Sequence, residues 1–171
     1  VETSLETNLT NTGCYMISTS GTSGRPKTAM LTQTNLINFI DAMKAEPYNL
    51  TEDDVVLNYS KCNFDASIME TLCILCIGGT VCVLPEQNTH LDILDITNKN
   101  NVTFVFMVPS LLKMLFNAFS YEQLSYSFSS IKNFIVGGEP VSLDLFKKLD
   151  KVCKHRAKIY NVYGPTESTI L

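Results

Sequence analysis

Length, composition and charge exclude several classes of protein. The chain has 171 residues, 45% of them hydrophobic, so it is one domain or part of a larger one, with enough apolar side chains to fill a core. Its net charge is −4 and it has no basic stripe interleaved with aromatic residues, which argues against a nucleic-acid partner. The most apolar stretch, residues 68–84, contains Glu70, Thr71 and two glycines, so no membrane span is predicted.

The N-terminus and the cysteines bear on where the protein works. Residues 1–12 are polar and lack the basic and apolar regions of a signal peptide, so we expect a poorly defined N-terminal segment. The first residue is not Met, which suggests a piece of a larger protein.

Six cysteines stand at positions 14, 62, 73, 76, 82 and 153. Those at 14, 73, 76 and 82 lie in apolar runs, where a free Cys packs as a small hydrophobe. We therefore expect a reducing cytoplasm, and no metal or redox role for the Cys73–Cys76 pair.

The first half of the chain alternates short β-branched runs with helical patterns. Its predicted elements are a strand at 14–19, a Ser/Thr/Gly loop at 20–27, a short return strand at 28–31, a helix at 34–45 stopped by Pro47, a strand at 55–59, and an apolar helix at 66–77 closed by two glycines.

The second half continues the same alternation. Its predicted elements are a strand at 81–84, an amphipathic helix at 91–98, a buried strand at 102–108, a helix from Pro109 to about 119, a Ser-rich loop at 120–130, a strand at 131–136, a helix at 142–152 and a strand at 158–162. This alternation is typical of an α/β fold in which helices flank a parallel sheet.

Residues 18–27, STSGTSGRPK, form a loop suited to phosphate. Gly21 and Gly24 allow positive φ, so that backbone N–H groups can point into one concavity. Hydroxyl groups and Lys27 add donors for phosphate oxygens. The spacing differs from a Walker A loop, because only two residues separate the glycines and Pro26 precedes the lysine. Taken alone, the loop also fits a flexible Ser/Gly turn.

Four motifs in order carry a resemblance to a known family. Residues 15–30, YMISTSGTSGRPKTAM, resemble the phosphate-loop signature YTSGTTGxPKG of the adenylate-forming superfamily. Residues 63–67, NFDAS, resemble the FDxS motif of its amino-acid-activating members, residues 136–139, VGGE, resemble the GGE turn, and residues 161–167, NVYGPTE, resemble NxYGPTE. From about Gly13 onward, the chain resembles part of the large N-terminal domain of a nonribosomal peptide synthetase adenylation domain.

The resemblance implies a two-step reaction. A carboxylate attacks the α-phosphate of ATP, giving an acyl-adenylate and pyrophosphate, and the acyl group then passes to the thiol of a phosphopantetheine arm. Charge builds on the phosphates during attack, so catalysis depends on positioning and electrostatic stabilisation, with Mg²⁺ bridging phosphate oxygens. The implied partners are ATP, an amino acid and a peptidyl carrier domain in the same parent polypeptide.

The resemblance also assigns roles to residues. Lys27, Thr166 and Glu167 would be catalytic, with Thr166 on the α-phosphate and Glu167 holding Mg²⁺. Tyr163 would stack on adenine. The residues implied to bind the nucleotide are Thr19, Ser20, Gly21, Thr22, Ser23, Gly24, Lys27, Gly137, Gly138, Glu139, Asn161, Tyr163, Gly164 and Thr166. Without the motif, Tyr163 fits an ordinary strand-end aromatic and Glu167 a solvated carboxylate.

Asp65 decides the implied substrate class. In amino-acid-activating relatives the matching Asp binds the α-ammonium group of the substrate. A carboxylate in an apolar stretch is costly unless it is paired, which favours this role. The alternative is the N-cap of the following helix, and one Asp can serve both purposes.

The implied substrate pocket is apolar apart from Asp65. By motif position its lining is Asp65, Ala66, Met69, Phe106, Ile135, Gly137, Val162, Ile170 and Leu171. Such a pocket rejects polar side chains, which would be buried without partners, and separates similar apolar ones by only about 1–3 kcal/mol per methylene. We therefore predict a hydrophobic amino acid, of aliphatic type such as Val, Leu or Ile.

Some features depart from the family pattern. Thr28 replaces the usual Gly after Pro-Lys, and Pro140 follows the GGE turn. The ribose-binding Asp, the hinge and the catalytic Lys of the small C-terminal domain would lie beyond residue 171, so we expect a partial domain that is inactive alone.

Four alternative functions remain open. They are an acyl- or aryl-CoA synthetase, which Asp65 disfavours, a carrier-linked amino-acid reductase, a non-catalytic scaffold and an unrelated phosphate-binding module.

Overall fold

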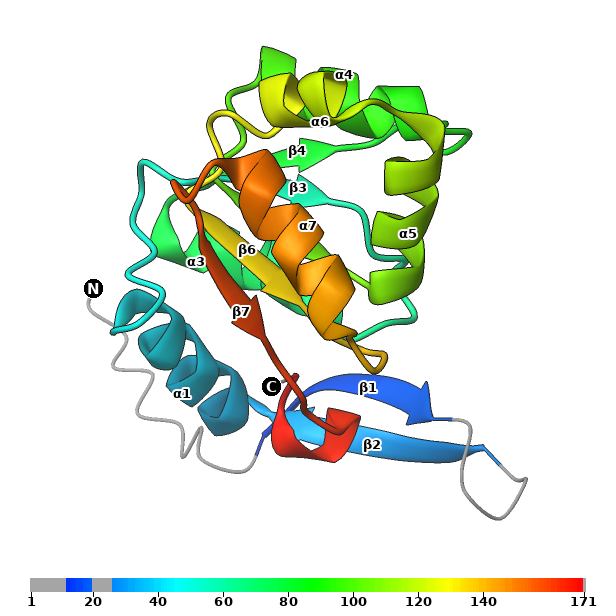
Figure 1. Cartoon of the computed structure of the whole chain (residues 1–171). Coiled ribbons are helices and arrows are strands. Elements are labelled where there is room, and N and C mark those ends of the chain that lie inside the picture. The colour runs from blue at the N-terminus through cyan, green and yellow to red at the C-terminus, as the bar shows by residue number, and fades with distance from the viewer. Residues whose placement is uncertain (1–11, 20–25, 171) are drawn as a thin grey trace.

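A five-stranded parallel sheet forms the centre of the computed structural model, which describes residues 12–19 and 26–170 (Figure 1). The strand order is β4-β3-β5-β6-β7, and every neighbouring pair is parallel. The strands are β3 (Val55–Asn58), β4 (Thr80–Val83), β5 (Phe104–Met107), β6 (Asn133–Val136) and β7 (Lys158–Asn161). The central strands β5 and β6 are buried along their whole length, as expected for a sheet covered on both faces. The predicted α/β fold is confirmed.

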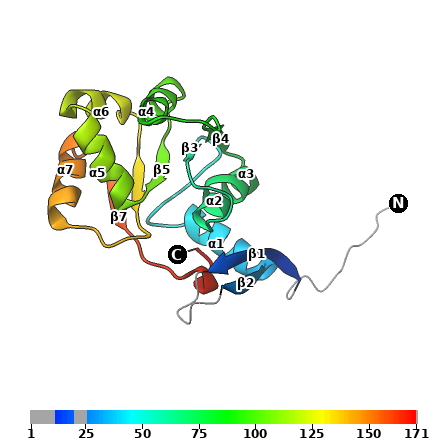
Figure 2. The ribbon, with the colours of Figure 1, turned by 90° about the vertical axis from the view of Figure 1, so that its right-hand side faces the viewer.

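Helices cover both faces of the sheet, because the side chains of each strand alternate between two apolar clusters. On one face, Val105 and Met107 pack with helices α4 (His90–Lys99), α5 (Pro109–Ala118), α6 (Tyr121–Ser127) and α7 (Leu143–Cys153). On the other face, Phe104 and Phe106 pack with α1 (Gln33–Lys44) and the helical segment 66–77. Figure 2 shows the sheet between these two groups of helices.

The first two strands form a separate antiparallel hairpin. β1 (Gly13–Thr19) pairs with β2 (Lys27–Thr32), and Thr19 lies opposite Lys27. Near the other end of the chain, the 3-10 turn η3 (Thr166–Ser168) contacts β2, as Figure 1 shows. The hairpin therefore packs against the last motif of the chain.

The predicted helix at 66–77 contains a π-helical segment. It consists of α2 (Ala66–Ile68), the π segment η2 (Met69–Cys73) and α3 (Ile74–Ile77). Gly78, with φ 96°, ends it in the left-handed conformation that its sequence position predicts. π segments occur frequently at functional sites, because the extra residue in the turn redirects side chains.

Two sequence predictions are wrong. The Ser-rich stretch 120–130 is not simply a loop, because α6 lies within it. Ser120 and Gln123 form a capping box, with the Gln123 amide donating to Ser120 Oγ and the Ser120 amide donating to Gln123 Oε1. Cys76 was expected in the core and is exposed, whereas Cys73 is buried and all six cysteines are free.

Within the described ranges, no helix has the length and apolar character needed to cross a membrane.

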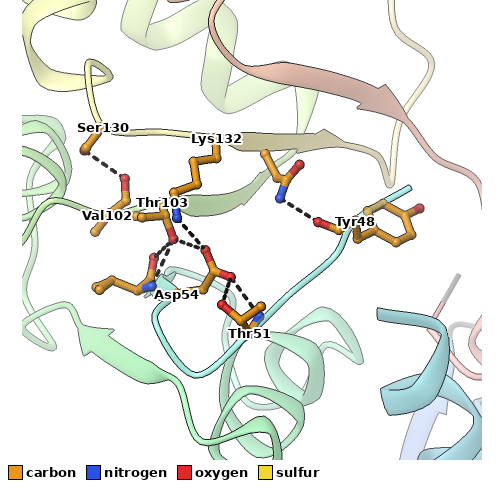
Figure 3. Close-up of polar contacts among 9 residues, drawn as sticks. Tyr48, Thr51, Asp54, Val102, Thr103, Ser130 and Lys132 are labelled. Carbon is orange, nitrogen blue, oxygen red and sulfur yellow. Dashed lines mark hydrogen bonds and ion pairs between the residues drawn. The ribbon is translucent and has the colours of Figure 1, made fainter. Parts of the chain in front are cut away.

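A polar network ties the amino ends of three strands together (Figure 3). Asp54, only 4% exposed, precedes β3 and accepts a hydrogen bond from Thr103 Oγ1, which precedes β5, at 2.7 Å. Lys132, which precedes β6, places its Nζ 3.6 Å from the same Asp54 oxygen. The Thr51 amide donates to the other oxygen at 2.9 Å, and Thr103 Oγ1 accepts from the Val55 amide at 3.0 Å. The network fixes strand register at the edge away from the motifs.

Replacing Thr103 tests this network. Thr103→Val keeps the shape of the side chain but removes the hydroxyl that donates to an Asp54 oxygen and accepts from the Val55 amide. We expect it to lower the free energy of unfolding by about 1–3 kcal/mol, the cost of unsatisfied buried polar groups. Thr103→Ser, which keeps the hydroxyl, should cost much less. Chemical denaturation measures both, and equal stability of the two variants would contradict the assignment.

Candidate active site

The predicted motifs meet at one edge of the sheet. The NFDAS motif follows β3, the GGE turn follows β6, and the YGPTE motif follows β7. Since these strands are parallel, their carboxyl ends lie at the same edge, which is where open α/β sheets bind ligands. The structure thus brings together segments that lie up to about a hundred residues apart in the sequence.

A small cavity of about 210 Å³ lies between these motifs. Five residues predicted for the substrate pocket line it: Asp65, Ala66, Phe106, Val162 and Ile170. Three residues predicted for the nucleotide also line it: Gly138, Gly164 and Thr166. One cavity therefore touches both predicted sets.

The remaining predicted pocket residues lie behind this lining. Met69 and Ile135 are fully buried in the same apolar cluster as Ala66, Phe106 and Ile170. They support the wall from within the core and do not face the cavity. Leu171 lies outside the described residues.

Gly137 is required by close packing between β6 and β7. A Cβ at this position would lie 2.6 Å from Val162 Cγ2, closer than real contacts allow, and only 3.0 Å from the Val162 carbonyl oxygen. Gly138 follows with φ +81°, a conformation that costs glycine little. These two glycines let the GGE turn approach the strand end that carries Val162.

Asp65 is half-buried at the start of α2. Its Oδ1 accepts a hydrogen bond from the Ala66 amide at 2.8 Å, so the capping role predicted as an alternative is present. Across residues 12–19 and 26–170, the Asp65 side chain makes no other hydrogen bond or ion pair. The second carboxylate oxygen remains for a cation in the cavity that Asp65 lines.

Tyr15 lies close to Asp65 and was not predicted as a site residue. Its hydroxyl is buried and, among the described residues, has no hydrogen-bond partner. Burial, followed by the charge of Asp65, raises the pKa of Tyr15 to about 12. Alternation along β1 gives the only sequence signal, since Tyr15 and the buried Ile17 share a face of the strand.

The Glu139 side chain caps the amino end of helix α5. Its two oxygens accept hydrogen bonds from the Ser110 amide at 2.9 Å and from Ser110 Oγ at 2.8 Å. The N-cap of α5 is Val108, whose side chain cannot accept, so Glu139 supplies the missing acceptor. The sequence predicted Glu139 at the nucleotide site but gave no sign of its partner Ser110, which lies 29 residues earlier.

Four of the residues predicted to bind ATP or Mg²⁺ face solvent. Lys27, Asn161 and Glu167 are exposed, and Tyr163 is 91% exposed at the end of β7. Thr19 Oγ1 donates to the Lys27 carbonyl at 3.4 Å, which closes the base of the hairpin. Ser20, Gly21, Thr22, Ser23 and Gly24 lie outside the described residues.

A larger cleft of about 1050 Å³ lies beside the small cavity. Residues 58–64 form much of it, and Glu139, Leu84 and Pro85 line its other side. Phe64, Phe106 and Val108 line both spaces. The cleft was not predicted, because the sequence pattern does not show how the loop after β3 folds.

Glu70 is a buried carboxylate that the sequence showed only as a break in an apolar run. It is fully buried and accepts four hydrogen bonds from residues 58–60, which follow or end β3. Burial raises the pKa of Glu70 from 4.5 to about 7, although the hydrogen bonds from Ser60, Asn58 and Tyr59 act in the opposite direction.

Comparison with known proteins identifies the family. The family model described as AMP-binding enzyme matches residues 4–171. The chain belongs to the AMP-binding enzyme family. This confirms the predicted resemblance to the adenylate-forming superfamily and excludes an unrelated phosphate-binding module.

Individual relatives agree with this family. The chain is 32% identical over 174 residues to the dapdiamide synthesis protein DdaD of Enterobacter agglomerans, covering 99% of this chain and 28% of that protein. It is 31% identical over 158 residues to the nonribosomal peptide synthetase imqB of Aspergillus flavus, covering 92% of this chain and 4% of that protein. The chain thus spans a minor part of the length of the relatives it matches.

A solved adenylation domain has the same fold. The crystal structure of Vibrio cholerae AlmE in complex with glycyl-adenosine-5′-phosphate matches with a TM-score of 0.77 and 25% identity. The match covers 92% of this chain and 29% of that one. The likeness to peptide synthetase adenylation domains that the four motifs predict is confirmed at the level of family and fold.

The Mg²⁺ site expected of this family fits the donors available. Within the described part of the chain, no three His, Cys, Asp or Glu side chains come together as a metal site. Glu167 is exposed and has no hydrogen-bond partner there. A single free carboxylate fits Mg²⁺, because this ion takes one or two carboxylates and completes its shell with water and substrate phosphates.

The raised pKa of Glu70 predicts a pH dependence of stability. A carboxylate whose pKa is raised in the folded state adds stability below about pH 4.5, and this is lost as the pH rises through about 7. Glu70→Gln cannot ionise and lacks this dependence. We therefore expect the free energy of unfolding of the wild type, relative to Glu70→Gln, to fall between these two pH values. Tyr59, which faces the carboxylate, does not titrate in this window.

Denaturant titrations of both proteins across that pH range measure the effect. Parallel pH profiles for wild type and Glu70→Gln would contradict it, because they would mean that Glu70 has the same pKa in the folded and unfolded states.

Proposed function

We propose that this chain forms the substrate-binding core of an adenylation domain that activates an amino acid with ATP. The observation that carries the proposal is the position of Asp65. It lines the same small cavity as Thr166 of the YGPTE motif, in an otherwise apolar wall. A carboxylate with one unused oxygen is complementary to the α-ammonium group of an amino acid, whose carboxylate would then point toward the nucleotide motifs.

The chemistry needs two substrates held in line. The amino-acid carboxylate attacks the α-phosphorus of ATP, a P–O bond forms, and the bond to pyrophosphate breaks. The chain's own groups bind and orient: Lys27 and the loop 19–24 hold the β and γ phosphates, and Thr166 holds the α-phosphate. Glu167 would hold Mg²⁺, which would supply positive charge where negative charge develops. Tyr163 stacks on the adenine, which accounts for an aromatic side chain that is 91% exposed at a strand end.

The substrate we propose is a hydrophobic amino acid, of aliphatic type. Ala66, Phe106, Val162 and Ile170 supply the cavity wall, and a polar side chain among them would lose its hydrogen bonds to water without replacement. The volume of about 210 Å³ favours a side chain of moderate size. Met69, Ile135 and Gly137 would shape the cavity from behind.

The acceptor we propose is the phosphopantetheine thiol of a peptidyl carrier domain. Similarity to a nonribosomal peptide synthetase supports this acceptor. We further propose that residues 1–171 do not catalyse the reaction by themselves, because the adenylate-forming mechanism uses a lysine from a C-terminal domain. The complete adenylation domain that carries this chain is therefore the protein to assay.

Amino-acid-dependent ATP–pyrophosphate exchange tests the proposal. We expect aliphatic amino acids to support exchange, and Asp65→Ala to lower kcat/KM for the amino acid on the order of 100-fold, as for loss of one partner of a desolvated charge pair. Asp53→Ala, which removes an exposed carboxylate at the opposite edge of the sheet, is the matched control and should leave exchange unchanged.

Three other outcomes of the exchange assay would contradict the proposal. Exchange with aryl or fatty acids but with no amino acid would indicate a CoA synthetase of the same superfamily. A folded domain that supports exchange with no carboxylic acid would indicate a non-catalytic scaffold. Exchange that survives Asp65→Ala unchanged would remove Asp65 from the site.

A further inference from the structure

Glu70 has no role in the reaction as described, yet its environment is unusual. It lies in the π segment η2 and is fully buried. Burying a carboxylate is costly unless hydrogen bonds satisfy its oxygens. The source of these hydrogen bonds therefore indicates which part of the chain Glu70 holds in place.

All four donors come from one short segment. Oε2 accepts from Asn58 Nδ2 at 3.0 Å, from the Tyr59 amide at 3.0 Å and from the Ser60 amide at 2.8 Å. Oε1 accepts from Ser60 Oγ at 2.7 Å. Two consecutive backbone amides thus point at one carboxylate, immediately after β3 ends. The carboxylate supplies the acceptors that the chain loses where the strand stops.

The segment held in this way leads directly to the proposed amino-acid site. Residues 58–64 line the larger cleft, and Phe64 and Asp65 line the smaller cavity. At the far end of the loop, Asp65 is fixed by its own hydrogen bond to the Ala66 amide. The helical segment 66–77 therefore holds the loop at both ends, through Glu70 at its beginning and through the start of α2 at its end.

We propose that Glu70 is a positioning residue for amino-acid binding, acting through Tyr59 and Ser60 to fix the loop 59–64 and thereby Phe64 and Asp65. The inference rests on the proposed function, because it assigns the loop to the amino-acid site. Small displacements of positioned groups reduce catalysis strongly, of the order of 100-fold for about 1 Å. Loss of the Glu70 contacts should weaken amino-acid binding and leave ATP binding unchanged, since two of the nucleotide motifs follow β6 and β7 and the third connects β1 to β2.

Two substitutions at Glu70 separate positioning from packing. Glu70→Gln can place its carbonyl oxygen where Oε2 lies and its amide toward Ser60 Oγ, which can accept, so the loop stays in place. Glu70→Leu fills a similar volume but leaves the Tyr59 and Ser60 amides without an acceptor. Ser60→Ala removes only the hydrogen bond to Oε1 and leaves the helix untouched.

The assay is ATP–pyrophosphate exchange in the complete adenylation domain, with amide hydrogen exchange of residues 59–64 beside it. We expect Glu70→Leu to raise KM for the amino acid about 10-fold or more, with KM for ATP within about twofold, and to lose amide protection in this loop. Glu70→Gln should stay within about threefold of the wild type in both KM values, and Ser60→Ala should raise only the amino-acid KM, by about threefold.

Three results would overturn the inference. They are an unchanged amino-acid KM in Glu70→Leu, an equal rise of both KM values in that variant, and a Glu70→Gln variant whose amino-acid KM rises as much as that of Glu70→Leu. If Glu70→Leu does not fold, Ser60→Ala serves as the test, and an unchanged amino-acid KM in Ser60→Ala overturns the inference. A wild-type domain without amino-acid-dependent exchange overturns the proposed function, whereas unchanged loop protection in a folded Glu70→Leu overturns the role of Glu70 alone.

Discussion

Parallel pairing of five strands places every carboxyl end at one edge of the sheet, and the site depends on that constraint. The motifs after β3, β6 and β7 are distant in sequence and meet only because these strands run in the same direction. At the opposite edge, Asp54, Thr103 and Lys132 fix the amino ends of β3, β5 and β6. The fold thus separates the polar groups that hold strand register from those available to ligands, and the central strands between them are apolar and buried.

Three carboxylates of the protein stabilise the fold, and a fourth, Asp65, differs from them in having an oxygen that no group in the described part of the chain occupies. Asp54 accepts hydrogen bonds from Thr51 and Thr103, Glu70 from residues 58–60, and Glu139 from Ser110. Each of these three has both oxygens occupied by groups of the protein and ties one element to another. Asp65 differs, because one amide occupies one oxygen and the carboxylate lines an apolar cavity. A partly satisfied charge in such surroundings is costly, which is the reason for proposing that a substrate ammonium group pairs with Asp65.

The sequence predicted what depends on local pattern and missed what depends on distant contacts. Hydrophobic periodicity located the parallel strands, and the motifs located Asp65, Gly138 and Thr166, which do line one cavity. The sequence does not predict helix α6, because its Ser-rich composition is typical of a loop, although Ser120 and Gln123 form a capping box. Glu70 and Glu139 gained their roles from partners at least ten residues away, which periodicity cannot show. For the same reason, Met69 and Ile135 proved to lie behind the cavity wall.

The most direct test of the central claim is a binding comparison that varies ligand and protein together. The complete adenylation domain and its Asp65→Ala variant are titrated calorimetrically with a non-hydrolysable aminoacyl-adenylate analogue and with the same analogue lacking the α-amino group. If the ammonium group binds Asp65, removing the amino group should weaken binding to the wild type about 100-fold and binding to Asp65→Ala very little. An equal loss in both proteins would show that the ammonium group does not bind Asp65, and would contradict the account of this site.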